Sequence, residues 1–200
     1  MAFYHLCCAI YISVLIQQRG QCGNPPDYFA KTWNEYKMGF QAGCEVWKGL
    51  DYIHEITSTR SYKLKVTLED YNGLYYVAYY NSFSVGSDST NYKLKISGYD
   101  KGLSSVGDSF TNIKYTGYNH NGMAFTTKDK DNDQWSENCS QYYGNGGWWF
   151  NKCLDSNLNG RSKKEEGSRG IYWYRKGNAS QSSVVPGNSW KGSKMELLSH

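Results

Sequence analysis

The chain has 200 residues, a length typical of one domain with a core large enough to need no metal or disulfide for its stability. Lysine and arginine number 22 and acidic residues 18, and no basic block concentrates the net charge of +4, which argues against a nucleic-acid partner. The mean hydropathy of −0.72 excludes a polytopic membrane protein, and the 16% aromatic content excludes a disordered chain. The 19 tyrosines and 21 glycines favour a loop-rich β or α+β domain.

Residues 6–16 form an apolar run near the start of the chain, and this run has two interpretations. The run is too short to span a bilayer, and in length it resembles the apolar core of a secretory signal peptide. Its isoleucines and Val14 also alternate with other side chains, as in a core strand. No basic residue precedes the run and no clear cleavage site follows it, so both interpretations stay open. We therefore treat residues 1–13 as an unassigned leading segment, signal-like or an atypical start.

Two short helices are predicted next. Thr32 and Glu35 form a capping box, and aromatic residues follow at helical spacing, which predicts a helix from about Thr32 to Phe40. A second short helix is marked by Leu50, Ile53 and Ile56. His54 lies on this second helix, where we expect a partly buried imidazole with a hydrogen-bond partner and not a catalytic base.

From Ser61 the hydrophobic period becomes two, which predicts a half-buried strand over residues 61–69. Asn72-Gly73 is a turn signal, and an aromatic strand follows over residues 75–83, so an antiparallel hairpin is expected. A further strand is predicted at residues 92–96. Beyond Gly98 we expect loops, with closing strands only near residues 171–173 and 194–197.

The chain has six cysteines, at Cys7, Cys8, Cys22, Cys44, Cys139 and Cys153. It has no Cys-x-x-Cys pair and its four histidines are scattered, which argues against a structural zinc site. A glycosylation sequon at Asn178 agrees with secretion. A disulfide between Cys139 and Cys153 would close a glycine-rich aromatic loop and lower the entropy of the unfolded chain.

Three carboxylates stand at alternate positions in Asp129, Asp131 and Asp133. Such side chains repel one another, and a hard cation such as Ca²⁺ would relieve the repulsion with oxygen ligands from this loop. The pattern is not an EF-hand, because Gln134 and Ser140 stand where that motif requires glycine and glutamate. From these residues alone, a solvated acidic turn is the alternative.

An aromatic cluster lies between Cys139 and Cys153, with Tyr142, Tyr143, Trp148, Trp149 and Phe150. Aromatic faces beside polar groups can line a pocket for sugars or peptides, and they can also form the core of a loop region. We expect both, with the tryptophans buried and Tyr143 nearer solvent. No convincing catalytic motif is present, so an enzyme is not expected.

Together these motifs resemble the fibrinogen C-terminal domain family, also called fibrinogen-related domains. The resemblance runs from about Val14 to the C-terminus, and its motifs are WNEYKMGF at 33–40, WKGLDYIH at 47–54, LED at 68–70, YYNSFSVG at 79–86, NGMAFTTKD at 121–129, Asn138-Cys139, GWW at 147–149, Cys153 and NLNG at 157–160. It implies an α+β fold with a central twisted antiparallel sheet, short helices and a loop-rich C-terminal region that binds calcium and ligand. The implied single domain covers residues 14–200, in parts 14–45, 46–126 and 127–200.

The resemblance also implies a set of site residues. The Asp131 and Asp133 carboxylates and the main-chain carbonyls of Trp135 and Glu137 would bind Ca²⁺, with Asp129 outside this ligand set. Cys139–Cys153 matches the C-terminal disulfide of the family, and Lys152–Cys153 is a candidate for a cis peptide bond. The first disulfide of the family is not recognisable. Separately from the resemblance, Cys22 and Cys44 flank the first predicted helix and are a candidate disulfide pair.

The ligand pocket of the family is only partly retained. Its implied positions here are Tyr143, Lys152, Cys153, Leu154, Gly167 and Ser168. Tyr143 matches the aromatic residue of acetyl-binding members. Leu154 and Gly167, however, replace a histidine and a tyrosine of that pocket, and Ser168 replaces the acid with which fibrinogen-type pockets bind an amino-terminal knob. The ligand itself is therefore not inherited from the family.

The resemblance implies a secreted, extracellular calcium-dependent module that binds carbohydrate in innate recognition or adhesion, similar to lectins that bind acetylated sugars. The resemblance also leads us to expect a homo-oligomer in the full-length context. The alternative is a protein-binding or matrix module of the angiopoietin or tenascin type that uses the charged loop 161–169 and binds no sugar.

Overall fold

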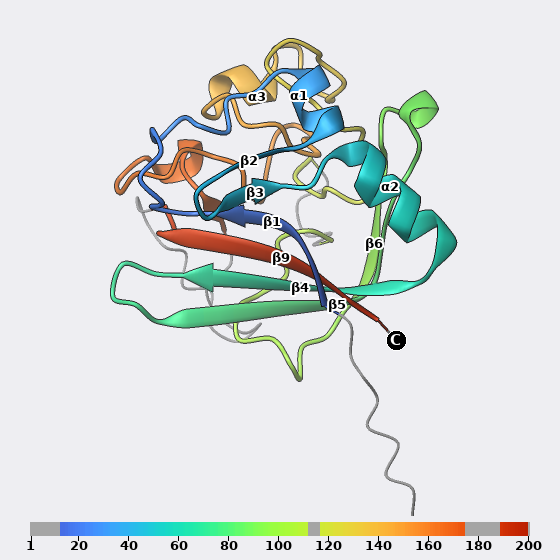
Figure 1. Ribbon diagram of the computed structural model, residues 1–200, viewed down its shortest axis with the longest axis horizontal. Coiled ribbons are helices and arrows are strands. Elements are labelled where there is room, and N and C mark those ends of the chain that lie inside the picture. Colours follow the sequence, from blue (N-terminus) through green and yellow to red (C-terminus); the bar gives the residue numbers. More distant parts are fainter. Residues whose placement is uncertain (1–12, 112–116, 175–188, 200) are drawn as a thin grey trace, which may run out of the picture.

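Figure 1 shows the computed structural model, which describes residues 13–111, 117–174 and 189–199. Residues 1–12, with Cys7 and Cys8, and the sequon at Asn178 lie outside the described residues. In the described ranges no helix is long and apolar enough to span a membrane.

The main sheet has seven antiparallel strands in the order β2-β3-β1-β9-β4-β5-β6. Its strands are β1 (Ser13–Arg19), β2 (Phe40–Ala42), β3 (Glu45–Trp47), β4 (Tyr62–Glu69), β5 (Tyr75–Val85), β6 (Leu94–Tyr99) and β9 (Gly192–Ser199). The remaining elements are the helices α1 (Trp33–Met38), α2 (Leu50–Thr59) and α3 (Cys139–Tyr142), the 3-10 turns η1 (Asp88–Thr90) and η2 (Gly167–Arg169), and the small strands β7 (Ser156–Asn157) and β8 (Tyr172–Trp173). The predicted α+β class with a central antiparallel sheet is confirmed.

Helix α1 begins where the capping box predicts. The Thr32 hydroxyl accepts a hydrogen bond from the Glu35 N–H, and the Glu35 carboxylate accepts one from the Thr32 N–H at 2.8 Å. The helix ends at Met38, before the predicted end at Phe40, because Gly39 adopts a φ of +91°. A Cβ at Gly39 would lie 2.8 Å from the Lys48 carbonyl oxygen, so only glycine fits this turn.

The predicted hairpin forms between β4 and β5, but the centre of the sheet comes from the two ends of the described chain. β9 lies between β1 and β4, and its Met195 faces Gln17 on one side and Val66 on the other. Residues 13–16 of the apolar run therefore form part of a central strand, in which Ile16 is fully buried. For these residues the strand interpretation is confirmed.

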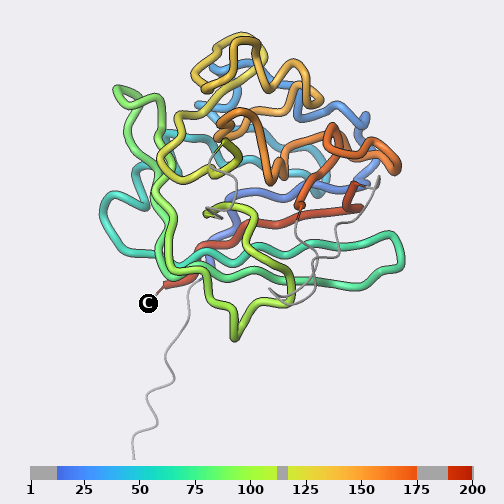
Figure 2. The backbone as a smooth tube through the Cα atoms, turned by 180° about the vertical axis from the view of Figure 1, so that it is seen from behind, coloured from blue at the N-terminus to red at the C-terminus, as the bar shows by residue number. Residues whose placement is uncertain are grey.

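Aromatic packing joins the sheet to the loop-rich C-terminal half. The rings of Tyr36, Trp47, Phe125 and Trp149 meet at centroid separations of 5.2 to 6.2 Å, and all four side chains are buried. Figure 2 shows the same relationship in the backbone, with the yellow and orange C-terminal loops beside the blue N-terminal segment above the sheet. This interlocked core fixes the loops that carry the candidate site.

A buried ion pair ties β1 to β3. Arg19 and Glu45 are both fully buried and contact each other directly. The Arg19 guanidinium also donates to the Gly160 carbonyl at 3.0 Å and lies 4.6 Å from the centre of the Phe29 ring. Arg19 therefore connects the end of β1 to the loops that contain Phe29 and Gly160.

Candidate functional site

The acidic loop that precedes α3 is organised by Asp133. Its Oδ1 accepts the Trp135 N–H and its Oδ2 accepts the Cys139 N–H, both at 2.9 Å. The Asp133 N–H in turn donates to Asp131 Oδ1 at 3.2 Å. Burial, with further contributions from the nearby Asp131 carboxylate, raises the pKa of Asp133 to about 6. Two carboxylates are thus held together at a cost that a bound cation would relieve.

The oxygen atoms of this loop are of the kind that a hard divalent cation prefers as ligands. In the described part of the chain, no hydrogen-bond donor reaches the carbonyl oxygens of Trp135 or Glu137, the two that the family resemblance implies as ligands. Asp131 is exposed and Asp133 half-buried, so their carboxylates can be reached from solvent. No group of three His, Cys, Asp or Glu side chains that could hold a metal exists among the described residues. A bound Ca²⁺ would therefore depend on main-chain carbonyls and water besides the two carboxylates.

Asp129 has a different environment from the other two aspartates. Its Oδ1 accepts the backbone N–H of Trp33, the first residue of α1, at 2.9 Å, and the Thr127 hydroxyl at 2.8 Å. Its carboxylate is thus engaged away from Asp131 and Asp133. That Asp129 stays outside the ligand set remains a prediction.

Both predicted disulfides are formed, each with a Cα–Cα distance of 5.6 Å. Cys22–Cys44 links the segments beside α1, and Cys139–Cys153 links α3 to the segment in which the Lys152–Cys153 peptide bond is cis, as the resemblance implied. The Asn151 carbonyl accepts the Gln134 N–H at 3.1 Å. The acidic loop before α3, α3 itself and the Cys139–Cys153 disulfide are therefore connected, and we call this connected region the rim.

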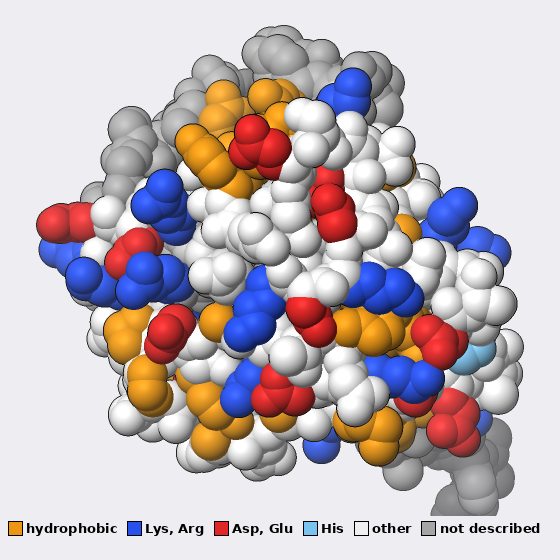
Figure 3. Space-filling view, turned by 90° about the horizontal axis from the view of Figure 1, so that it is seen from above, with side chains coloured by type: hydrophobic (Ala, Val, Ile, Leu, Met, Phe, Trp, Pro, Cys, Tyr) orange, Lys and Arg blue, Asp and Glu red, His pale blue; other side chains and the backbone are white. Residues whose placement is uncertain are grey.

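Aromatic side chains line this rim. The Tyr142 ring is half exposed and lies edge-on to Trp135 at 5.4 Å and to Tyr143 at 5.0 Å. The Arg169 guanidinium lies 5.7 Å from the centre of the Tyr142 ring. Figure 3 views the molecule from above, and hydrophobic side chains gather beside acidic ones near one edge of this face. Trp148 and Trp149 are fully buried and Tyr143 is only partly buried, as predicted.

The NLNG stretch at residues 157–160 is hydrogen-bonded to the loop that contains Tyr143. The Asn157 amide donates to the Tyr143 carbonyl at 3.3 Å, and the Asn159 amide donates to the Gly147 carbonyl at 2.9 Å. A Cβ at Gly146 would lie 2.1 Å from the Asn159 carbonyl oxygen, so the two loops pack backbone to backbone. Glycine is required there because the loops approach too closely for a side chain.

Four further groups near Tyr143 were not singled out as individual site residues by the sequence analysis. Burial, with smaller contributions from Tyr142 and Tyr118, raises the pKa of Tyr143. Burial and then the Asp155 carboxylate raise the pKa of Tyr172 to about 12. Tyr118, Tyr172, Asp155 and Arg169 therefore lie within electrostatic reach of this rim. Tyr118 and Asp155 stand outside regular elements, Tyr172 lies in the two-residue strand β8, and Arg169 ends η2 within the charged loop 161–169. The high tyrosine content was the only sequence signal for the two tyrosines.

The structure separates the predicted ligand residues by exposure. Lys152 is exposed, whereas Cys153 and Leu154 are buried, with 4% and 7% of their surface accessible. Gly167 and Ser168 lie in η2 and are partly exposed. η2 lies beside the loop after α3, because a Cβ at Gly144 would lie 2.4 Å from the Arg169 carbonyl oxygen. Tyr143 and η2 thus share one region, and the Leu154 side chain forms part of the core beneath it.

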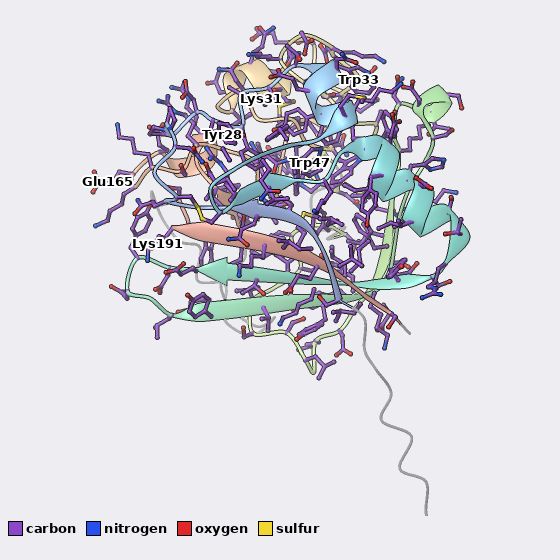
Figure 4. The ribbon with its side chains drawn as sticks, in the orientation of Figure 1. Tyr28, Lys31, Trp33, Trp47, Glu165 and Lys191 are labelled. Atoms are coloured by element: carbon purple, nitrogen blue, oxygen red, sulfur yellow. A yellow bond between two sulfur atoms is a disulfide. The ribbon has the colours of Figure 1, made fainter. Side chains whose placement is uncertain are left out.

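The charged loop 161–169 forms its own ion pairs. The Glu166 carboxylate lies 3.8 Å from both the Arg161 and the Lys163 side chains. Glu165 is exposed and projects at the side of the molecule in Figure 4, on the same side as Lys191. The Glu166 side chain is only 14% exposed, whereas Lys163, Lys164 and Glu165 are exposed, so their charges are available to a charged partner.

Comparison with known proteins decides the family. A family model for the C-terminal globular domain of fibrinogen beta and gamma chains matches residues 13–197. The chain belongs to the fibrinogen C-terminal domain family. Domains of this family are binding modules and not enzymes, so this chain is a ligand-binding module.

Curated relatives of this fibrinogen-related domain include proteins of several kinds. Human fibroleukin is 41% identical over 150 residues, covering 72% of this chain and 33% of fibroleukin. Chicken tenascin-R is 41% identical over 161 residues, covering 80% of this chain and 11% of tenascin-R. Techylectin-5A of Tachypleus tridentatus is 39% identical over 147 residues, covering 73% of this chain and 47% of that protein. The chain therefore spans less than half the length of these relatives.

Solved structures share the fold of this fibrinogen-related domain. The fibrinogen-like globe domain of human ANGPTL2 superimposes with a TM-score of 0.72 at 34% identity, covering 92% of this chain and 79% of that one. Lamprey fibrin D-dimer, in complex with the peptide Gly-His-Arg-Pro-amide, gives a TM-score of 0.78 at 25% identity, covering 92% of this chain and 60% of that one.

Proposed function

We propose that this fibrinogen-related domain is a secreted, calcium-dependent module that binds carbohydrate, in particular acetylated sugars, in innate recognition or adhesion. The observation that carries the proposal is the position of Trp135. Its carbonyl is a predicted calcium ligand, and its ring packs against Tyr142 at 5.4 Å in the aromatic rim that includes Tyr143. A cation bound in the acidic loop would therefore order the Trp135 side chain, which lies in the proposed ligand-binding rim.

The chemistry of the rim suits a sugar. Aromatic faces pack against the C–H surfaces of a sugar ring, while hydroxyl, carboxylate and guanidinium groups bind its polar substituents. The phenol hydroxyls of Tyr143 and Tyr172 can donate as well as accept hydrogen bonds. The relationship to techylectin-5A supports this choice.

The remaining parts of the proposal follow from the wider chain. The two disulfides support an oxidising, extracellular compartment, and Asn178 is the proposed glycosylation site. One weak sugar site gains strength when several copies bind together, so we propose a homo-oligomer in the full-length protein.

A glycan array that includes acetylated sugars tests this function, with calcium and with excess EDTA. We expect calcium-dependent binding that falls about tenfold or more in Tyr143→Ala and Trp135→Ala. Tyr52→Ala is the matched control, because Tyr52 is 41% exposed but lies on α2, away from the rim. Absence of binding to every sugar, both with and without calcium, would contradict the proposal.

The second candidate is a protein-binding module of the angiopoietin or tenascin type. The exposed charges of loop 161–169 favour it, as does the similarity to ANGPTL2 and tenascin-R. It predicts salt-sensitive capture of an extracellular protein and no sugar binding. Alanine at Lys163, Lys164, Glu165 and Glu166 should then abolish capture, and unchanged capture would contradict this candidate.

A further inference from the structure

We infer that Asp129 is a positioning residue that holds the candidate calcium loop against helix α1, so that calcium binding is coupled to the packing of the N-terminal part of the domain. This inference rests on the proposed calcium site. By charge and spacing Asp129 belongs with Asp131 and Asp133, yet its carboxylate binds the Trp33 N–H at 2.9 Å. That bond joins residues far apart in the sequence.

The two lysines on either side of Asp129 make the same connection. Lys128 donates from Nζ to the Ala30 carbonyl at 2.6 Å. Lys130 Nζ lies 3.8 Å from the centre of the Trp33 ring and donates to Asn91 Oδ1 at 2.9 Å. Figure 4 shows Lys31 and Trp33 near α1 at the top of the molecule, where this segment meets the N-terminal part. Three successive side chains thus bind residues 30–33, a pattern that an isolated surface contact would not give.

The other side of the same segment is held by α3 and the residue that caps it. The Asn138 amide donates to the Thr127 carbonyl at 2.9 Å, and the Gln141 amide donates to the Lys128 carbonyl at 2.7 Å. Thr127 and Lys130 close the turn by backbone hydrogen bonds to each other. Residues 127–130 therefore form a bridge between α1 and α3, and Asp131 and Asp133 follow directly from it.

The bridge has an energetic consequence for the metal. A cation site gains affinity when its ligands are held in place before binding, and loss of an outer partner lowers metal affinity about 10–100-fold. Coupling of this kind is reciprocal, so calcium must also stabilise the contact between the bridge and α1. Asp129 thereby acts on the ion through position and not through its charge.

Calcium titration by calorimetry separates position from charge. Asp129→Ala should weaken calcium binding about 10–100-fold. Asp129→Asn keeps an acceptor oxygen for the Trp33 N–H and should stay within about threefold of the unchanged chain. Asp100→Ala is the matched control, because the Asp100 carboxylate likewise accepts backbone N–H hydrogen bonds, from Gly102 and Leu103, but in the loop after β6. Equal weakening by Asp129→Asn and Asp129→Ala would overturn the inference and make Asp129 a ligand through its charge.

Hydrogen exchange of the Trp33 amide provides a second readout. Calcium should slow this exchange in the unchanged chain, and the effect should disappear in Asp129→Ala. If that variant does not fold, Thr127→Val and Lys130→Met remove single contacts of the bridge and should each weaken calcium binding to a smaller degree. Calcium binding in the unchanged chain without any effect of these variants overturns the inference alone. No calcium binding in the unchanged chain overturns the proposed calcium dependence together with it.

Discussion

The fully buried imidazole of His120 donates its Nδ1–H to the carbonyl oxygen of Trp149 at 2.7 Å. Its Nε2 accepts the backbone N–H groups of Asp155 and Ser156 at 3.2 and 3.0 Å, and this network assigns the tautomer. The neutral ring thus has a partner on each nitrogen, whereas a protonated ring would direct an N–H at two donors. Burial lowers the pKa of His120 to about 4.

This environment predicts acid destabilisation. Between its unfolded pKa of 6.5 and its folded pKa of about 4, His120 binds a proton only in the unfolded chain, so its contribution to stability is complete above pH 6.5 and is lost as the pH falls toward 4. The loss in the free energy of unfolding amounts to at most about 3–4 kcal/mol. Urea denaturation at several pH values measures it. His120→Gln should be less stable at neutral pH but should lack this component of the pH dependence, and His54→Gln should retain it.

Asp131 and Asp133 are expected to carry the charge that binds calcium. Asp133→Asn and Asp131→Asn should each weaken calcium binding about 100-fold or more, because direct ligands matter at least as much as the groups that orient them. Isothermal titration with calcium measures the change. Asp100→Asn serves as control, since Asp100 stands in an Asx-type turn outside the acidic loop. Unchanged affinity in the loop variants would place the ion elsewhere.

The two disulfides should differ in what they support. Replacing Cys139 and Cys153 by alanine opens a loop with a sequence separation of 14 and should lower the free energy of unfolding by about 3 kcal/mol. The same replacement should also disrupt the rim and thus ligand binding. Replacing Cys22 and Cys44 should cost a similar amount of stability and leave calcium and ligand binding intact, because that bridge lies beside β1 and β3. Denaturation and binding assays on both pairs compare them. Equal loss of binding in the two variants contradicts this assignment.

The buried Arg19–Glu45 pair should be sensitive to loss of one partner. Glu45→Gln leaves the Arg19 charge buried without a carboxylate, and we expect a loss of about 3–5 kcal/mol in the free energy of unfolding. Glu69→Gln breaks the more exposed pair with Lys191 and should cost less than about 1 kcal/mol. Chemical denaturation of the two variants tests the contrast, and similar small losses would show that water reaches Arg19.

Much of the local structure was predictable because it depends on neighbours in sequence. The capping box of Thr32 and Glu35 fixes the start of α1, and the turn at Asn72-Gly73 between alternating segments fixes the β4–β5 hairpin. The resemblance likewise depended on motifs at ordered spacing. The small elements β2, β3, β7 and α3 were missed, because segments of two to four residues have no periodicity to recognise.

The amino-acid sequence by itself thus determined the α+β class, the main helices and hairpin, the family and the composition of the acidic loop. Only the tertiary structure decided that β9 lies between β1 and β4, that Asp129 turns from its neighbouring carboxylates to Trp33, and that Tyr118 and Tyr172 lie near Tyr143. The physical reason is the separation of these residues along the chain. Each of these contacts joins segments distant in the chain through irregular loops, and which backbone N–H or ring a side chain meets there is set by the packing of the whole core.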